Sequence, residues 1–210
     1  MYAKFFKRWI DFLLALTALA ILWPVLLILT VVGAIAMGGN PFFLQPRPGK
    51  IGKDGKEKIF KLIKFRTMSN AKDENGNLLP DEKRLGRYGA WLRSTSLDEL
   101  PEILNILVGD LSCCGPRPLL VAYLPRYSPR QRRRHEVRPG LTGYAQAYGR
   151  NSLTWEEKFE KDVYYVDHIS FVLDIKILIK TVMVVLKREG ISSETSATME
   201  EFMGSDIEVQ

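Results

Sequence analysis

Cysteine is scarce in this chain of 210 residues, because Cys113 and Cys114 are the only copies and they are neighbours. Adjacent residues seldom reach the geometry of a disulfide bond, so the sequence excludes a disulfide framework. A reduced, cytoplasmic setting is therefore expected for the part of the chain that contains them.

Charge is absent from residues 12–37, an apolar run that is interrupted at Trp23 and Pro24. As one straight helix the run would reach about 39 Å, which exceeds the hydrocarbon core of a bilayer at about 30 Å. Basic residues normally collect on the cytoplasmic side of a membrane. Here they flank both ends, as Lys4, Lys7 and Arg8 before the run and Arg47, Lys50 and Lys53 after it.

These flanks predict a re-entrant membrane helix that bends at Pro24 and returns to the same face, because proline removes a backbone hydrogen bond there. A single transmembrane helix with a proline kink is one alternative. A cleaved signal peptide is the other, although the run is longer than the apolar region of such a peptide.

The chain also lacks room for a second catalytic domain. Residues 1–37 are expected to form the membrane anchor, and residues 38–210 one domain of ordinary size. The tail from Ser192 onward carries no catalytic signal and is expected to be exposed and partly flexible. A net charge of +6 indicates an anionic partner, with anionic lipid, a phosphorylated substrate and nucleic acid as the candidates.

The pattern along residues 38–210 predicts an α+β fold that is mainly helical. Two strands, separated by a loop at residues 47–50, are expected at residues 42–45 and 58–65. Helices are expected at residues 85–92, 155–166 and 173–186. The last helix is apolar but too short for a comfortable span, so it lies either in the core or in the membrane interface.

Two adjacent carboxylates, Asp98 and Glu99, form the centre of the candidate site. Ser96 and Glu99 have the spacing of a capping box, which predicts a helix whose first turn holds both acids and which continues through Leu107. Acids at this position can simply complement the helix dipole. Near bound phosphate, one carboxylate could instead attack or hold a metal ion while the other manages a proton.

Cations surround this pair in the sequence. Lys64 and Arg66 follow a predicted strand, and Arg117 stands between Pro116 and Pro118, which fix its direction. A rigidly held arginine suits bidentate binding of phosphate, whereas a surface loop that happens to contain arginine is the simpler explanation.

Residues 126–138 are rich in arginine, and a basic run beside a membrane is attracted to anionic headgroups. Residues 144–150 then mix aromatic residues with Gln146 and Arg150. This composition could stack a base and hydrogen-bond a nucleotide. An aromatic core with a surface arginine is the alternative.

Taken together, these motifs resemble the bacterial sugar transferase family, the monotopic polyprenyl-phosphate phosphoglycosyl transferases. The resemblance runs from Lys7-Arg8 to Asp174, and within the family it is closest to the bacillosaminyl phosphotransferases of bacterial N-glycosylation. The matching motifs are residues 64–68 (KFRTM), 93–94 (RS), 96–101 (SLDELP), 115–118 (GPRP), 138–143 (RPGLTG) and 149–150 (GR).

The resemblance implies transfer of a phospho-sugar from a UDP-sugar to undecaprenyl phosphate with Mg²⁺, at the cytoplasmic face of the bacterial inner membrane. UMP leaves, and downstream glycosyltransferases extend the product. The expected donor is UDP-N,N′-diacetylbacillosamine, with UDP-galactose, UDP-glucose and UDP-GlcNAc as alternatives.

The resemblance also implies residue roles. Asp98 is the expected nucleophile and metal ligand, and Glu99 assists it. The expected substrate-binding residues, whose cations would neutralise phosphate charge, are Lys64, Arg66, Arg93, Arg117, Arg138, Gln146 and Arg150.

Some positions depart from the family pattern. Trp23 replaces the serine that usually precedes the proline, and Tyr144 and Tyr148 stand where tryptophan and asparagine are common.

A membrane-tethered nucleic-acid-binding protein is a rival interpretation. It would leave Asp98 and Glu99 unused, and the sequence lacks a recognition-helix pattern, so nucleic acid is not an expected partner. The intact acidic pair likewise argues against a non-catalytic scaffold.

Overall fold

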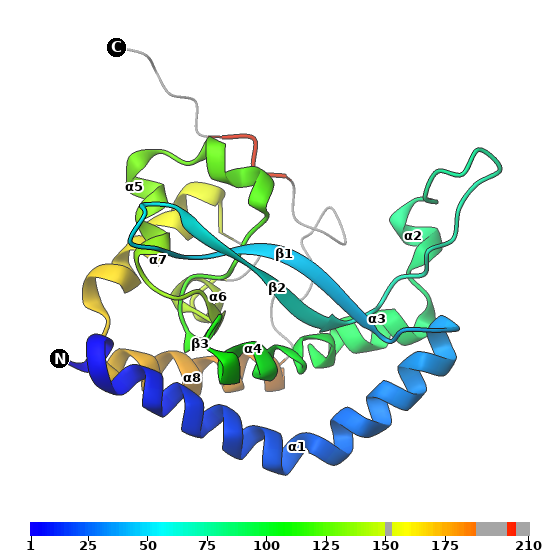
Figure 1. Ribbon diagram of the computed structural model, residues 1–210, viewed down its shortest axis with the longest axis horizontal. Coiled ribbons are helices and arrows are strands. Elements are labelled where there is room, and N and C mark those ends of the chain that lie inside the picture. Colours follow the sequence, from blue (N-terminus) through cyan, green and yellow to red (C-terminus); the bar gives the residue numbers. More distant parts are fainter. Residues whose placement is uncertain (150–152, 188–200, 205–210) are drawn as a thin grey trace.

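The computed structural model of the protein describes residues 1–149, 153–187 and 201–204, except for the side chains of residues 186 and 187. The chain begins with one π-helical turn, Tyr2–Phe6, which leads into the long helix α1, Lys7–Met37. Figure 1 shows α1 bowed beneath the other elements, along one whole side of the molecule. Within the described residues, it is the one helix that is long and apolar enough to cross a membrane.

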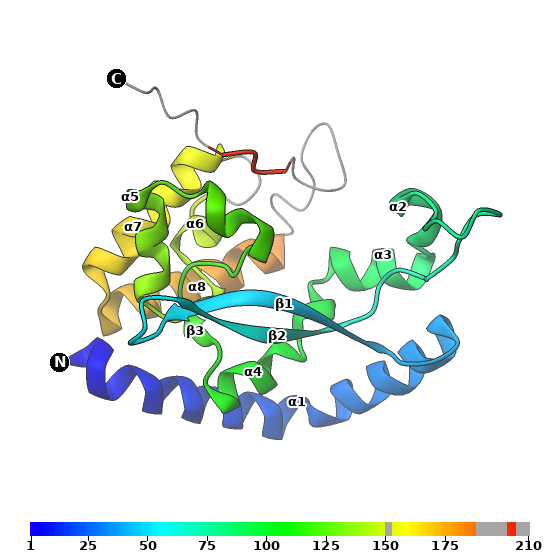
Figure 2. The ribbon, with the colours of Figure 1, turned by 45° about the horizontal axis from the view of Figure 1, so that its top comes forward.

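Helix α1 is continuous through Pro24, so the structure does not divide it into two helices there, and its re-entrant course in a membrane stays a prediction. Proline removes one hydrogen bond and crowds the preceding turn, and here the helix accommodates it within a gradual bow (Figure 2). The helix ends at Gly38, whose φ of 62° is the left-handed conformation that glycine adopts at low cost.

Two long strands follow, β1 (Phe42–Ile51) and β2 (Glu57–Phe65), which pair antiparallel with Phe42 opposite Phe65. The strand predicted at residues 58–65 is confirmed. The loop predicted at residues 47–50 is wrong, because these residues continue β1. Prolines are tolerated there since a two-stranded ribbon has an edge on each strand, where no partner needs the missing N–H.

The predicted capping box was also wrong. Ser96 has a φ of 56° and makes no capping hydrogen bond, and Leu97–Glu99 form a short 3₁₀ turn, η2. Helix α4 (Glu102–Val108) begins only after Pro101. The cause is Pro101, which has no N–H to donate to the Leu97 carbonyl, so the N–H of Leu100 takes that acceptor instead.

The remaining elements complete an α+β fold that is mainly helical, as predicted. Strands β3 (Ser112–Cys114) and β4 (Gly140–Thr142) form a small parallel pair. The predicted helices correspond to α3 (Arg87–Ser94), α7 (Trp155–His168) and α8 (Phe171–Lys187). Shorter helices are α2 (Asp81–Arg84), η3 (Val121–Arg126), α5 (Pro129–Arg132), η4 (Arg133–Glu136) and α6 (Tyr144–Ala147).

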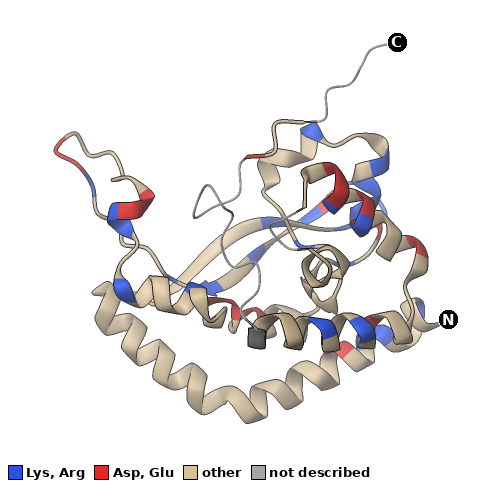
Figure 3. Ribbon diagram, turned by 180° about the vertical axis from the view of Figure 1, so that it is seen from behind, with Lys and Arg blue, Asp and Glu red and all other residues tan. Residues whose placement is uncertain are grey.

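In the view of Figure 1, α8, α4 and α3 follow one another across the molecule above α1, and α4 packs against α1. Helix α8 buries Ile177 and Val184 in the core, which is one of the two placements expected for it, and it also exposes apolar residues on its outer side. Exposed apolar residues also occur on α3 and α4, at Trp91 and Val108. Figure 3 shows that charge on α1 is confined to its N-terminal part.

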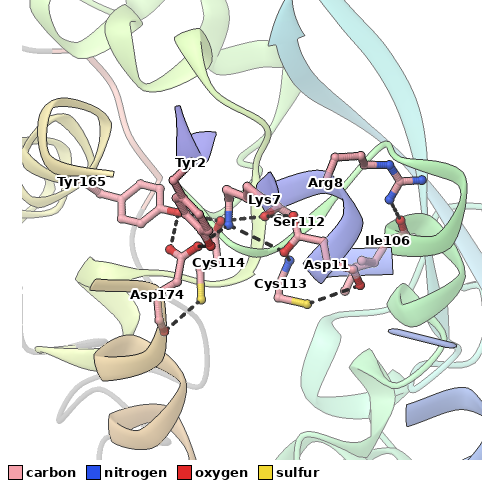
Figure 4. A network of polar contacts seen from close by, with 10 residues as sticks. All are labelled: Tyr2, Lys7, Arg8, Asp11, Ile106, Ser112, Cys113, Cys114, Tyr165 and Asp174. Carbon is pink, nitrogen blue, oxygen red and sulfur yellow. Dashed lines mark hydrogen bonds and ion pairs between the residues drawn. The ribbon is translucent and has the colours of Figure 1, made fainter. Parts of the chain in front are cut away.

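A buried polar network ties the start of α1 to the rest of the molecule (Figure 4). Lys7 Nζ lies 2.6 Å from Asp174 Oδ2 on α8, and Tyr165 donates to the other oxygen of Asp174 at 2.7 Å. The hydroxyl of Ser112 donates to Asp11 Oδ2 at 2.7 Å. Helix α1 is therefore fixed to α8 and β3 at its N-terminal end.

Within residues 201–204, the described part of the tail, Glu201 and Met203 are exposed as predicted, but Phe202 contradicts the prediction. Phe202 is 1% exposed and packs among the rings of Tyr123, Trp155 and Phe159. Arg126 binds both the Glu201 carboxylate and the carbonyl of Phe202. Residues 192–200 and 205–210 of the tail lie outside the described part of the chain.

Candidate active site

The turn η2 presents Glu99 to cations from two other segments. Lys64 Nζ, at the end of β2, lies 2.8 Å from Glu99 Oε1, and the guanidinium of Arg117 binds both Glu99 oxygens. Burial opposes ionisation of Glu99, but Arg117 and Lys64 outweigh it and hold its pKa well below the usual range. Glu99 is therefore a fixed anion in the ligand-free protein.

Asp98 has a different environment from its neighbour. It makes no hydrogen bond or ion pair with any residue that the structure describes, so its oxygens are available to a ligand. Burial and the adjacent Glu99 raise the pKa of Asp98, while Lys64, Arg117 and Arg93 oppose that rise. The two carboxylates thus differ in both contacts and acidity, which suits separate roles.

A third carboxylate, Glu102, was not predicted. It is 2% exposed at the start of α4, and its Oε1 lies 3.1 Å from Lys64 Nζ. Its spacing of three residues from Glu99 was a usable signal, because residues three apart share one side of a helix. Lys64 thus stands between two carboxylates, Glu99 and Glu102.

Two arginines expected to bind substrate, Arg93 and Arg117, are oriented by their neighbours. Arg93, on α3, donates to the hydroxyl of Thr67 at 3.1 Å. Arg117 lies between two prolines in the loop after β3. Arg47, which was not predicted, donates to the Pro118 carbonyl at 3.1 Å, and burial together with the nearby Arg117 lowers its pKa to about 10.

A cavity of about 750 Å³ opens beside these groups. Arg93, Glu99 and Arg117 line it, together with Gln146 on α6. Gln146 donates to the Leu141 carbonyl at 3.2 Å. Most of the remaining wall is apolar, and α7 and α8 contribute several of its residues, so the cavity combines a charged end with a largely apolar body.

A buried ion pair stabilises the wall of this cavity. Arg134 donates to Asp162 Oδ2 at 3.0 and 2.7 Å and also to the Arg117 carbonyl at 2.7 Å. The arginine-rich segment, predicted to lie on a solvated or membrane-facing surface, therefore contributes Arg134 to the core, together with the buried Gln131 and His135. Composition alone could not distinguish the buried Arg134 from its neighbours Arg130 and Arg132, which are exposed.

Other predicted residues are not brought to the cavity. Neither Arg66 nor Arg138 lines it, and their side chains make no hydrogen bond within the described residues. Arg150 lies outside the described residues. Tyr144 packs its ring against Tyr148 and Tyr164 at centroid distances of 4.6 and 5.0 Å, an aromatic cluster that agrees with the simpler of the two interpretations.

The chemistry of the donor groups fits Mg²⁺ held jointly with a substrate. No group of three or more His, Cys, Asp or Glu within residues 1–149, 153–187 and 201–204 is arranged as a metal site. Mg²⁺ in phosphate-transfer sites is commonly held by one or two carboxylates together with substrate phosphates, so such a group is not required. Asp98, with its unpaired oxygens, is the residue that would bind it.

Comparison with known proteins places this site in a family. The sequence matches the bacterial sugar transferase family over residues 2–188. It is 51% identical over 199 residues to the uncharacterized sugar transferase EpsL of Bacillus subtilis (strain 168), covering 95% of this chain and 96% of EpsL. It is 34% identical to the exopolysaccharide production protein ExoY of Sinorhizobium fredii, covering 88% and 87% of the two chains.

A longer relative shows the same similarity in part of its length. The chain is 36% identical to the UDP-galactose-lipid carrier transferase of Erwinia amylovora, and the match covers 90% of this chain but 42% of that protein. The match therefore spans less than half of that relative. Because the family and two relatives of similar length match across most of the chain, the protein belongs to the bacterial sugar transferase family and is a phosphoglycosyl transferase.

Proposed function

We propose that the protein transfers a sugar phosphate from a UDP-sugar to undecaprenyl phosphate, giving undecaprenyl-diphosphate-sugar and UMP. The observation that carries this proposal is Asp98, a carboxylate without a partner among the described residues, which adjoins Glu99 and is faced by the cations Lys64, Arg117 and Arg93. Glu99, Arg93 and Arg117 line the charged end of a largely apolar cavity next to it. Such a site matches a charged diphosphate and a lipid acceptor in the same reaction.

In the first step, a carboxylate oxygen of Asp98 attacks the β-phosphorus of the donor. The bond from that phosphorus to the bridging oxygen breaks, and UMP leaves with the electron pair. Lys64, Arg93 and Arg117 lie around the carboxylate pair, where they stabilise charge on the phosphoryl oxygens. The product of this step is an aspartyl phospho-sugar.

In the second step, an oxygen of the polyprenyl phosphate attacks the same phosphorus and releases the Asp98 carboxylate. Glu99 holds Lys64 and Arg117 in position during both steps and assists the transfer to lipid. Mg²⁺, when bound through Asp98 and the donor phosphates, would neutralise phosphate charge.

The donor sugar is the finer part of the proposal. Resemblance to the bacillosaminyl phosphotransferases favours UDP-N,N′-diacetylbacillosamine. Relatives whose names specify galactose, glucose or N-acetylgalactosamine make those UDP-sugars the alternatives. The product would pass to downstream glycosyltransferases of a glycoconjugate pathway.

The proposed location is the cytoplasmic face of the bacterial inner membrane, with α1 as the anchor. The contacts at both ends of α1 support this arrangement. Lys7 binds Asp174 near one end, and the Leu29 carbonyl accepts from Tyr88 near the other at 3.3 Å. A helix that crossed the bilayer could not contact one cytoplasmic domain at both ends.

Intact-protein mass spectrometry after incubation with Mg²⁺ and a UDP-sugar, without polyprenyl phosphate, tests the mechanism. We expect a phospho-sugar adduct that maps to Asp98 and disappears when the acceptor is added. Asp98→Asn should abolish both the adduct and UMP release, whereas Glu99→Gln should retain part of the first step and lose transfer to lipid. Asp110→Asn, which alters a carboxylate paired with the exposed Lys58, is the matched control.

The same assay run across a panel of UDP-sugars identifies the donor. Fastest turnover with UDP-galactose, UDP-glucose, UDP-N-acetylgalactosamine or UDP-GlcNAc would replace UDP-N,N′-diacetylbacillosamine as the assigned donor. Sequential kinetics without an adduct and without acceptor-independent UMP would contradict the two-step route. Asp98 would then be only a metal ligand for direct attack by the lipid phosphate.

A further inference from the structure

Lys64 lies between two carboxylates, Glu99 and Glu102, which differ in the hydrogen bonds that they accept. Glu99 receives hydrogen bonds from both Lys64 and Arg117. Glu102 contacts the same ammonium at 3.1 Å, but its buried Oε1 receives no hydrogen bond within the described residues. Because a buried carboxylate with weak compensation loses much of its hydration, its charged form is costly.

The groups that face Glu102 come from each element around it. Lys64 approaches from β2, Glu99 from η2, Arg117 from the loop after β3 and Arg47 from β1. Burial raises the pKa of Glu102 to about 7, with Lys64 and Arg117 opposing the rise and Glu99 adding to it. Glu102 therefore changes charge in the neutral range, while Glu99 stays ionised.

We propose that Glu102 is a positioning residue for donor binding, which sets through the shared Lys64 how much positive charge the site offers to the donor diphosphate. The inference rests on the proposed function, because it takes the donor to be a UDP-sugar. When Glu102 is neutral, the charge of Lys64 is balanced by Glu99 alone. When Glu102 is ionised, Lys64 is divided between two anions and attracts phosphate less.

The direction of the effect follows from the charge. Protonation of Glu102 makes the site more positive by one unit, so the donor binds more tightly at lower pH. The KM for the donor should therefore rise as pH increases from about 6 to about 8. A change of one unit charge at this distance from the donor phosphates, partly screened, corresponds to about a fivefold change in the KM for the donor.

The decisive variant is Glu102→Gln, which keeps the shape of the side chain and mimics its neutral form. The first half-reaction is measured without acceptor, because the phosphate monoester of a polyprenyl acceptor ionises near pH 6 and would add its own pH dependence. We expect the variant to keep a low KM across this range and to change kcat by less than about twofold. Glu57→Gln, at the opposite end of β2, should retain the wild-type pH dependence.

A measurement on the ligand-free protein separates this inference from the proposed function. Carbon-13 NMR of labelled glutamate carboxyls should show one group that titrates near pH 7 and is missing from Glu102→Gln. Absence of that group, or the same pH dependence of KM in wild type and Glu102→Gln, overturns the positioning role. If no UDP-sugar yields UMP, the proposed function fails, and the NMR titration alone decides whether Glu102 is the neutral-range switch.

Discussion

His135 is a buried imidazole that folding holds in its neutral form. It is 4% exposed on η4, and burial together with Arg134 lowers its pKa to about 4. Between pH 4 and its ordinary value near 6.5, the unfolded chain binds a proton that the folded chain excludes. His135 therefore lowers the free energy of unfolding as the pH falls between these two values.

We expect the loss attributable to His135 to approach about 3 kcal/mol at the acid end of the window. His135→Asn removes the titrating group, so the free energy of unfolding of this variant should depend less on pH. Denaturant unfolding in detergent micelles, at several pH values between about 4.5 and 7.5, measures the difference. Equal pH slopes for the two proteins would show that His135 contributes nothing.

Individual site residues were predictable where a motif specified them and unpredictable where only the fold gives them a partner. Lys64, Asp98 and Glu99 were identified from sequence motifs, and the structure brings them together. In the sequence, Glu102 looks like any acidic residue at the start of a helix. It becomes part of the site only because α4 packs against the end of β2. Arg47 was missed because its segment was taken for a loop.

At the scale of elements, α1 and α4 are joined by apolar packing and by the polar contacts of one side chain, Arg8. Arg8 donates to the carbonyls of Ile106 and Leu107 at 2.6 and 2.7 Å, at the C-terminal end of α4. The Ile106 carbonyl also accepts from the N–H of Gly109 at 3.1 Å, and a cation is favourable at this end of the helix dipole. Arg8 therefore fixes the far end of the helix that begins next to the acidic pair.

Arg8→Gln should lower the free energy of unfolding by about 1 to 3 kcal/mol, because two charge-assisted hydrogen bonds are lost. Faster amide hydrogen exchange in α4 should accompany the loss. Lys4→Gln, which neutralises an exposed cation on the preceding turn, serves as the comparison and should have little effect. Unchanged stability and exchange in Arg8→Gln would show that the contact does not hold α4.

The elements themselves were predicted best where periodicity was strong. Residues 155–166 and 173–186 alternate buried and exposed positions at helical spacing, and both helices are present. The junction at residues 96–101 failed because Pro101 withdraws a donor from the expected helix. The continuity of β1 through Pro46 and Pro48 could not be predicted either, because it depends on an unpaired strand edge that only the assembled ribbon reveals.

At the scale of the whole molecule, α1 lies along one domain rather than projecting from it. Ala15 belongs to a core cluster with Phe60 and Leu62, and Leu29 to another with Phe65 and Leu92. The exposed side of the helix is apolar at Trp23, Leu27 and Ile28, around the proline. The middle of α1 is therefore the part best suited to dip into lipid, with both ends held at one face.

Single-cysteine labelling in intact cells tests this topology. In a background with Cys113 and Cys114 replaced by alanine, cysteines at the exposed positions Lys4 and Lys50 should both be inaccessible to a membrane-impermeant thiol reagent. Both should react after the inner membrane is permeabilised. Labelling at either position before permeabilisation would restore the transmembrane alternative.

The network at the start of α1 has a practical consequence, because the anchor is not detachable. Removing residues 1–37 would take Tyr2 and Lys7 from Asp174 Oδ2 and Asp11 from the N–H of Cys113, which leaves these groups without partners. It would also open two core clusters to water. A water-soluble form of this enzyme therefore has to be made by replacing the outward apolar residues of α1 with polar ones, while every residue on its inner side is kept.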